Sequence, residues 1–260
     1  QDSVPLVAIT GNVQNDLIGR DSFQEVDITG ITTPITKHNY IVKDVERLAA
    51  TVQEAFVIAN SGRKGPVLID IPKDVTAAKT EYSPLPKFAP RPWPKLNPRE
   101  VELALEAISA AKKPLIYAGG GVVFSDASLA LQEFSQKLDI PVCVSMMGIS
   151  SVPWHYPLYL GMIGMHGTPA ANIAARECDL LITIGARFSD RVAADRKRFA
   201  RNAKILHIDV DPSEISKNVT AHYSLIGDAQ EVLSLLTSRL TKKQNPEWTR
   251  HVLSRKKTAV

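Results

Sequence analysis

The chain has 260 residues, of which 44% are hydrophobic, and a formal net charge of +4. That length holds one large domain or two smaller ones, and no segment approaches the ~20 consecutive apolar residues that a membrane-spanning helix needs. The basic residues are spread out rather than concentrated among aromatic residues, which is not the pattern of a nucleic-acid binder. We therefore expect neither a membrane nor a nucleic acid as a partner.

The two cysteines, Cys143 and Cys178, lie in apolar or helical stretches. Free cysteine is usually a buried core residue, and the N-terminus has no signal-peptide pattern. Both are therefore expected to be reduced, in a cytoplasmic protein. Neither has a second cysteine or a histidine at metal-ligand spacing, which predicts no metal site.

The dominant pattern is a short apolar run, a turn and an amphipathic helix, repeated along the chain. The apolar runs are continuous, which is typical of parallel strands covered on both faces. Strands are expected at 6–10, 67–71, 114–118, 140–145, 180–184, 205–209 and 225–227. Helices are expected at 44–61, 98–111, 126–138, 169–177 and 229–240. This alternation predicts an α/β fold with a doubly wound, Rossmann-like parallel sheet.

A proline-rich segment at 81–97 interrupts the pattern and is predicted to be an extended linker. Residues 98–245 hold enough elements for a domain. Residues 1–80 hold two expected strands and one helix, which cannot close a core, so we expect a partial α/β domain there. The basic tail at 242–257 is expected to be a solvated helical face or a frayed end, with residues 246–260 forming the start of another linker.

Two segments are rich in glycine. Gly119-Gly120-Gly121 comes directly after the strand at 114–118, where it either lets backbone approach a phosphate or merely makes a tight turn. The second segment, 161–169, reads GMIGMHGTP and precedes a helix capped by Thr168. Its His166 is either a ligand contact or a structural loop histidine.

Charged residues follow three further strands. The segment 185–192 reads GARFSDRV, and its arginines suit an anionic ligand such as a diphosphate, although a surface salt-bridge loop is the alternative. Asp209 and Asp228 also follow strands, where a carboxylate can bind ribose hydroxyls or serve as a turn residue or helix cap. Contacts at several strand ends of one sheet favour a nucleotide or dinucleotide site.

Three further segments, at 22–25, 35–40 and 61–75, read SFQE, ITKHNY and SGRKGPVLIDIPKDV. Followed in order by the GGG, GMHGT and GARFSDRV segments, they resemble thiamin-diphosphate-dependent enzymes, and among these the acetolactate synthase (acetohydroxyacid synthase) large-subunit family. The resemblance extends to about residue 240. SGRxGPVLID alone is shared with glyoxylate carboligase and pyruvate oxidase, which remain alternatives, as does a non-catalytic nucleotide-binding module.

The resemblance implies an enzyme of three α/β domains. Residues 1–80 would be the C-terminal part of the thiamin pyrimidine-binding domain, and residues 98–245 the central FAD-binding domain. The family decarboxylates pyruvate and transfers the two-carbon aldehyde unit to pyruvate or 2-ketobutyrate, in the biosynthesis of valine, leucine and isoleucine. It uses thiamin diphosphate, Mg²⁺ and an FAD that undergoes no net redox change. A homodimer or higher oligomer and a regulatory small subunit are the implied partners.

The resemblance also implies site residues. No catalytic or metal-binding residue is carried over, since neither the activating glutamate nor the Gly-Asp-Gly…Asn motif matches a segment here, so we expect an internal fragment that is inactive alone. The residues toward the substrate channel would be Phe23, Gln24 and Lys73. The FAD contacts would be Arg63, Gly119, Gly120, Gly121, Ser145, Met146, Gly164, Met165, His166, Gly185, Arg187, Asp190, Arg191, Val192, Asp209 and Asp228. Ser189 is left out, because family members often carry aspartate there.

Overall fold

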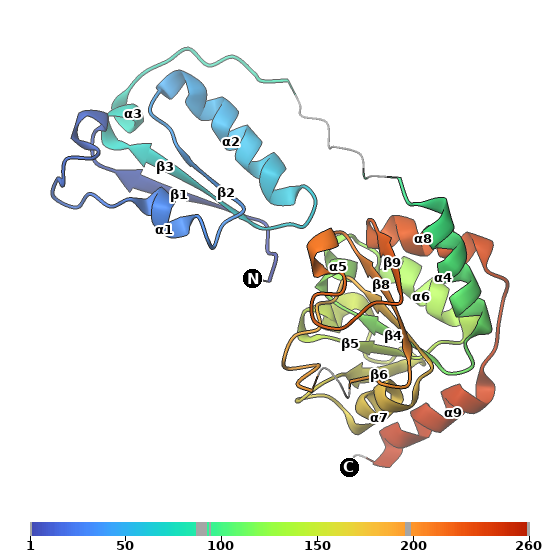
Figure 1. The fold of residues 1–260 in the computed structure, drawn as a ribbon. Helices are drawn as coiled ribbons and strands as arrows, with labels where there is room; N and C mark the ends of the chain where they lie inside the picture. Colours follow the sequence, from blue (N-terminus) through green and yellow to red (C-terminus); the bar gives the residue numbers. More distant parts are fainter. Residues whose placement is uncertain (1, 87–92, 94, 196–198, 259–260) are drawn as a thin grey trace. The chain divides into compact units, whose positions relative to one another are not determined.

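The computed structural model describes residues 2–86, 93, 95–195 and 199–258 (Figure 1). Internal contacts divide the chain into two compact units, unit 1 at residues 1–92 and unit 2 at residues 93–260. Each unit is described by itself. No helix within the described ranges combines the length and the apolar character that crossing a bilayer requires.

Unit 1 contains a three-stranded parallel sheet in the order β1-β3-β2. The strands are β1 (Leu6–Asn12), β2 (His38–Ile41) and β3 (Pro66–Pro72). Asp70 on the central strand is fully buried, and its carboxylate accepts hydrogen bonds from Thr10 Oγ1 at 2.7 Å and Asn12 Nδ2 at 2.6 Å. These two bonds satisfy a polar group that would otherwise be costly to bury.

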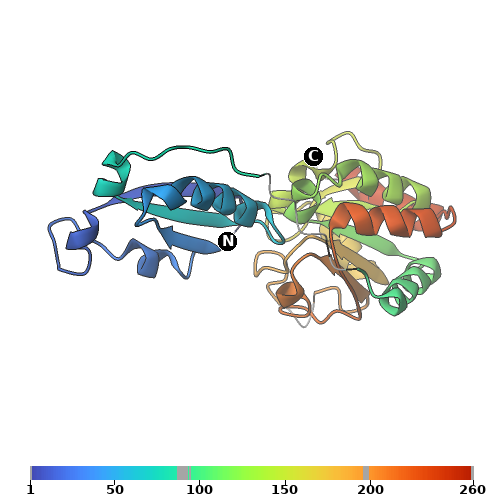
Figure 2. The same ribbon diagram turned by 90° about the horizontal axis from the view of Figure 1, so that it is seen from above.

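The main helix of unit 1, α2 (Val45–Asn60), lies along the sheet (Figure 2). It buries Ala55 and Ala59 against strand residues that include Val67 and Ile69. The short elements of this unit are η1 (Asn15–Leu17), α1 (Ile28–Thr32) and α3 (Lys73–Ala77). The expectation of only two strands and one helix before residue 80 was therefore wrong: β2 was missed because His38–Ile41 carries no continuous apolar run.

Unit 2 contains a six-stranded parallel sheet in the order β6-β5-β4-β7-β8-β9. The strands are β4 (Pro114–Ala118), β5 (Val142–Val144), β6 (Tyr159–Met162), β7 (Leu180–Ile184), β8 (Lys204–Asp209) and β9 (Tyr223–Ile226). The chain starts in the middle, winds outward to β6, and then returns to add β7 on the other side of β4. The predicted doubly wound sheet is confirmed, with β6 as an additional strand.

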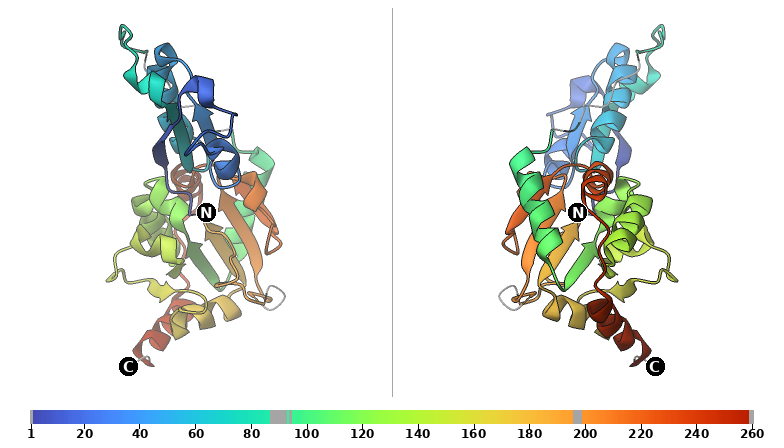
Figure 3. Two further views of the ribbon diagram at one scale, coloured as in Figure 1. Left: turned by 90° about the vertical axis from the view of Figure 1, so that its left-hand side faces the viewer. Right: turned by 90° about the vertical axis from the view of Figure 1, so that its right-hand side faces the viewer.

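Helices cover both faces of this sheet. On one face lie α4 (Pro98–Ala110), α5 (Gly120–Phe124), α6 (Ser128–Leu138) and α8 (Ala229–Arg239). On the other lie α7 (Pro169–Glu177) and α9 (Pro246–Ser254), shown side by side in Figure 3. The short 3-10 helices are η2 (Met146–Ser151), η3 (Pro212–Glu214) and η4 (Arg255–Thr258). Cys143 and Cys178 are both buried free thiols in the second face's core, as expected.

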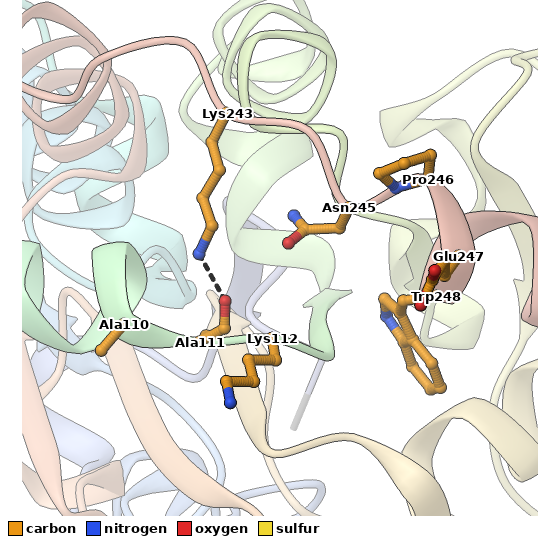
Figure 4. Close-up of a pocket in the computed structure, with 8 residues that line it drawn as sticks. All are labelled: Ala110, Ala111, Lys112, Lys243, Asn245, Pro246, Glu247 and Trp248. Atoms are coloured by element: carbon orange, nitrogen blue, oxygen red, sulfur yellow. Dashed lines mark hydrogen bonds between the residues drawn. The ribbon is translucent and has the colours of Figure 1, made fainter.

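The segment after residue 241 forms helix α9, which agrees with the helical alternative for the basic tail and not with a frayed end. Trp248 and Val252 of α9 are buried, and Trp248 Nε1 donates to Pro114 O at 2.8 Å. Lys243 Nζ donates to Ser109 O at 2.7 Å and to Ala111 O, and so caps the C-terminal end of α4 (Figure 4). This segment is packed structure because its apolar side chains belong to the core between the sheet and α7.

The proline-rich segment has no helix or strand at 81–86, 93 or 95–97, while 87–92 and 94 lie outside the described residues. Its ends are attached to the two units. Pro86 O accepts from Gln53 Nε2 of α2 at 2.9 Å, and Leu96 packs against the core of unit 2. The linker predicted at 81–97 stays a prediction for its central residues.

Candidate cofactor site

The candidate residues of unit 2 follow the carboxyl ends of its strands. Because every neighbouring pair in the sheet is parallel, these ends share one edge. The winding direction reverses between β4 and β7. In doubly wound folds the loops at such a reversal separate to either side and leave a crevice where ligands bind. The GGG and GARFSDRV segments are the two loops at this position.

The glycine turn after β4 packs directly against the loop after β7. Gly119 N donates to Ile184 O and Gly121 N to Gly185 O, both at 2.9 Å. A Cβ on Gly121 would lie 2.6 Å from Gly185 Cα, closer than any real contact. These two glycines are therefore required by the backbone itself, which is the tight-turn alternative. Gly120 differs, because a Cβ there meets Met147 Cβ at 3.0 Å and no backbone atom closer than 3.5 Å.

The loop between β6 and α7 is joined to the same region. Gly164 has a φ of +102°, where a side chain is strained, and Asn172 holds it by accepting from its N–H at 2.9 Å and donating to its O at 3.0 Å. Met165 N donates to Arg191 O at 2.8 Å. Met165 and His166 are exposed. The structure thus brings the GMHGT and GARFSDRV segments into contact.

The loop after β7 carries the cationic groups. Arg187 and Arg191 are both exposed at this edge. Arg191 Nε lies 3.8 Å from Asp190 Oδ2, and the two side chains are 69% and 78% exposed. Such an exposed pair contributes little to stability, so the predicted salt-bridge alternative is realised at Asp190 and Arg191 with little energetic gain. Val192, the last member of the predicted set in this loop, is half-buried.

The two candidate aspartates both have local structural roles. Asp209 Oδ1 accepts from Asp211 N at 2.9 Å. Asp228 Oδ1 accepts from Gln230 N at 2.9 Å and Glu231 N at 3.3 Å, which caps α8. The turn and cap alternatives are thus both realised. A carboxylate can accept about four hydrogen bonds, so these roles are compatible with an additional ligand contact.

Residues after β5 and β6 add apolar surface to this edge. Ser145 N donates to Ala118 O at 2.9 Å, which places the loop beside the end of β4. Met146 is 64% exposed and Met165 is 59% exposed. Exposed thioether side chains adapt to flat aromatic surfaces. The edge therefore combines cationic, acidic and apolar groups.

Four of the predicted residues belong to unit 1 instead. Phe23 is 89% exposed, Gln24 has a φ of +64°, and Lys73 is exposed at the start of α3. Arg63 Nε donates to Ser3 Oγ at 2.9 Å. Their roles toward a substrate channel or FAD stay predictions.

A pocket of about 390 Å³ lies at the opposite, amino edge of unit 2, between the end of α4 and the start of α9 (Figure 4). Its Lys243 is already bonded to the carbonyls of α4, and burial lowers the pKa of that amine. The predicted motifs lie elsewhere, so we assign no ligand to this pocket.

Two residues beneath the carboxyl edge were not singled out from the sequence. Thr183 and His207 are fully buried polar side chains in otherwise apolar strands. The signal was visible, because a histidine inside the run Ile205-Leu206-His207-Ile208 needs a polar partner when buried. Asn172, which holds Gly164, left no comparable signal.

Comparison with known families places the chain. Residues 101–236 match the thiamine pyrophosphate enzyme central domain. The chain belongs to this family of thiamin diphosphate enzymes.

The particular resemblance is to acetolactate synthase large subunits. Identity is 45% to a probable acetolactate synthase large subunit of Methanocaldococcus jannaschii, over 100% of this chain and 45% of that protein. It is 46% to an acetolactate synthase of Arthrospira platensis, over 92% and 42%. It is 44% to acetolactate synthase isozyme 2 large subunit of Escherichia coli, over 96% and 45%. The predicted resemblance is confirmed, and the chain spans less than half the length of these relatives.

Proposed function

We propose that this chain is part of an acetolactate synthase large subunit and that unit 2 binds FAD at the carboxyl edge of its sheet. The complete enzyme would decarboxylate pyruvate and join the two-carbon unit to pyruvate or 2-ketobutyrate, in branched-chain amino-acid biosynthesis. The observation that carries the proposal is the meeting of two loops at the reversal point of the sheet, where the glycine turn after β4 lies beside the loop that carries exposed Arg187.

The residues at this edge fit the chemistry of FAD. The diphosphate is an anion, and exposed Arg187 offers a planar set of donors beside the glycine turn. The flavin ring is apolar and flat, which matches the exposed faces of Met146 and Met165. Ribose and ribityl hydroxyls need acceptors, which Asp209 and Asp228 provide at the ends of β8 and β9.

Unit 1 would contribute to the pyrimidine-binding domain, with Phe23, Gln24 and Lys73 toward the substrate channel. Thiamin diphosphate, held with Mg²⁺, supplies the electron sink for decarboxylation when it is bound. The role of the chain's own residues is to bind and orient. FAD held at an edge of exposed arginine and methionine would act as a structural element there, since the reaction has no net redox step.

The resemblance extends the proposal to partners and location. The substrates would be small 2-ketoacids, and the enzyme would be a homodimer or higher oligomer in the cytoplasm. Two of the relatives above are named as large subunits, which supports a regulatory small subunit as a further partner.

The test is a titration of the 260-residue chain with FAD, followed by quenching of flavin fluorescence. Saturable binding that FMN or riboflavin cannot reproduce at equal concentration is expected, because the adenylate half would occupy the ends of β8 and β9. Binding of AMP and NAD⁺ as strong as that of FAD would instead support a general nucleotide-binding module. Absence of FAD binding would contradict the proposal for unit 2.

A further inference from the structure

Four polar side chains form a row inside unit 2, just below the candidate site. Cys143, Tyr117, Thr183 and His207 are successive Cα partners across β5, β4, β7 and β8. All four are 0% exposed and lie on the face of the sheet that packs against α7 and α9. Hydroxyl and imidazole groups are rarely placed in a core without a hydrogen-bonding purpose.

The contacts of His207 define its hydrogen-bonding state. Nε2 lies 3.2 Å from Ala186 O. A carbonyl oxygen only accepts, so Nε2 must carry the proton, and in the neutral ring Nδ1 is then an acceptor. Within the described part of the chain, His207 Nδ1 and Thr183 Oγ1 are both buried without a hydrogen-bond partner. A second proton on Nδ1 would therefore place an N–H donor in the core without a hydrogen-bond acceptor.

The charged and titratable groups around the ring do not reverse this conclusion. Asp209 Oδ2 lies 3.9 Å from Nε2. Burial lowers the pKa of His207, while the bond to Ala186 O and the Glu214 carboxylate act in the opposite direction with smaller effect. Tyr117 also lies in the row, and burial raises the pKa of its hydroxyl, opposed by the charge of Arg187. Both row members are neutral at neutral pH.

The segment above the row is held at three consecutive residues. Ala186 is bonded through its carbonyl to His207. Arg187 O accepts a long hydrogen bond from Tyr117 Oη at 3.5 Å. The Phe188 ring is 3% exposed and meets the His207 ring edge-on, with centroids 5.3 Å apart and an interplanar angle of 74°. These contacts hold the backbone of the segment against the row, and the Arg187 side chain is exposed at the carboxyl edge.

We propose that His207 is a positioning residue: its neutral ring donates to Ala186 O and supports Phe188, so that Arg187 is presented to an anionic ligand at the carboxyl edge. The identity of that ligand as FAD rests on the proposed function, whereas the support of the loop does not. Nothing in the proposal requires His207 to touch the ligand.

Two substitutions separate hydrogen bonding from simple space-filling. His207→Gln keeps an N–H donor of similar reach and removes titration, and His207→Leu removes the donor and leaves Ala186 O unpaired. His251→Gln is the matched control, because His251 lies on α9 and bonds to Glu177 Oε2 at 2.8 Å, away from the loop. The first measurement is amide hydrogen exchange of Ser189 and Val192 in the ligand-free chain, since both amides close turns within this loop.

In His207→Leu we expect loop amides to exchange about fivefold faster or more, because loss of one buried hydrogen bond shifts a local opening equilibrium by that order. FAD affinity should fall by a similar factor. His207→Gln and His251→Gln should remain within about twofold of the wild-type chain in both measurements. Unfolding in urea at several pH values provides the third measurement.

The pH dependence has a definite sign. In the unfolded chain a histidine has a pKa of about 6.5, and in the folded chain the pKa of His207 is lower. Below about pH 6.5 this histidine binds a proton in the unfolded chain but not in the folded chain. Protonation therefore favours the unfolded state, and the wild-type chain loses stability as the pH falls. This loss should be smaller in His207→Gln.

The outcomes distinguish the two proposals. If the wild-type chain binds no FAD but His207→Leu alone loosens the loop, the positioning role stands and the FAD assignment fails. If FAD binds and His207→Leu has wild-type loop exchange and affinity, the positioning role is overturned. It is also overturned if His207→Gln behaves like His207→Leu. If His207→Leu does not fold, the test rests on the affinity, loop exchange and pH profile of His207→Gln. Wild-type affinity and exchange, with a smaller loss of stability at low pH, support the positioning role. Any other result overturns it.

Discussion

Gly121→Ala should lower the stability of the fold, whereas Gly120→Ala should lower FAD binding and leave the stability nearly unchanged. At Gly121 the new Cβ would lie 2.6 Å from Gly185 Cα, whereas carbon atoms normally approach to about 3.5–4.0 Å. The overlap of about 1 Å falls between two backbones that are also joined by the bond from Gly121 N to Gly185 O. Neither backbone can yield cheaply. We expect a loss of about 3 kcal/mol in the free energy of unfolding.

At Gly120 the new Cβ would lie 3.0 Å from Met147 Cβ, and Met147 is 40% exposed. The neighbour has to give by only a few tenths of an ångström, and Gly120 begins helix α5 without a positive φ, so its backbone conformation is open to alanine. The stability of Gly120→Ala should therefore stay within about 1 kcal/mol of the wild-type chain. If FAD approaches the turn at this residue, the added methyl group should weaken its binding about tenfold or more.

Thermal melts of the ligand-free chain and flavin absorbance after gel filtration measure the two effects separately. For a unit of this size, about 3 kcal/mol corresponds to a decrease of roughly 6–12 °C in Tm, expected for Gly121→Ala only. Gly120→Ala should retain its Tm and lose flavin. A Gly120→Ala variant with a lowered Tm but normal flavin content would show that all three glycines serve the backbone alone. An unchanged Tm in Gly121→Ala would refute the packing argument.

Three other variants or assays extend the test. Arg187→Ala should weaken FAD binding about tenfold, since a charge-assisted contact contributes roughly 1.5–3 kcal/mol. The control is Arg176→Ala, at an exposed residue near the end of α7, which should not change the affinity. Equal dissociation constants for the two variants in a flavin fluorescence titration would contradict the assignment of Arg187. Trp248→Ala should lower the free energy of unfolding in urea by about 3–5 kcal/mol, because a 5% exposed ring and its bond to Pro114 O are lost. Trp154→Ala is the matched control, since that side chain is 84% exposed. Equal losses of stability at both positions would contradict a packed α9. The 260-residue chain should form no acetolactate from pyruvate with thiamin diphosphate and Mg²⁺, because it lacks the expected motifs; substantial turnover would disprove that expectation.

The sequence predicted the strands that are buried on both faces. The runs at 114–118 and 180–184 match β4 and β7 residue for residue, because a strand covered by helices has to be apolar throughout. Helix starts were equally readable, since Asn97, Thr168 and Asp228 each cap a helix through a side-chain oxygen. These signals are local in the sequence and need no tertiary information.

The missed elements lack such local signals. Strand β6 contains Gly161 at a φ of +100° and pairs across an irregularity in register, so its segment was interpreted only as a glycine-rich loop. Helix α9 was obscured by its basic residues, although Trp248 and Val252 are spaced four apart and Asn245-Pro246 repeats the pattern of Asn97-Pro98. In both cases the decisive contacts come from distant parts of the chain.

The sequence predicted that the candidate site lies at the ends of the strands, but it did not predict the structural role of each residue there. It offered both a helix cap and a ribose contact for Asp228, and the structure shows the cap. The sequence could not show that Gly119 and Gly121 are needed by Gly185, because that depends on which loops meet. For the same reason His207 could be recognised as a support only after its bond to Ala186 O was visible.

The central claim is that FAD lies along the carboxyl edge of the larger sheet, across the ends of β4 and β7. A crystal structure of the 260-residue chain with FAD tests this most directly. We predict the diphosphate within hydrogen-bonding distance of the Arg187 side chain, and the dinucleotide in contact with Gly120. FAD bound at the amino edge, near Lys243 and Trp248, or on unit 1 with Arg187 untouched, would contradict the claim.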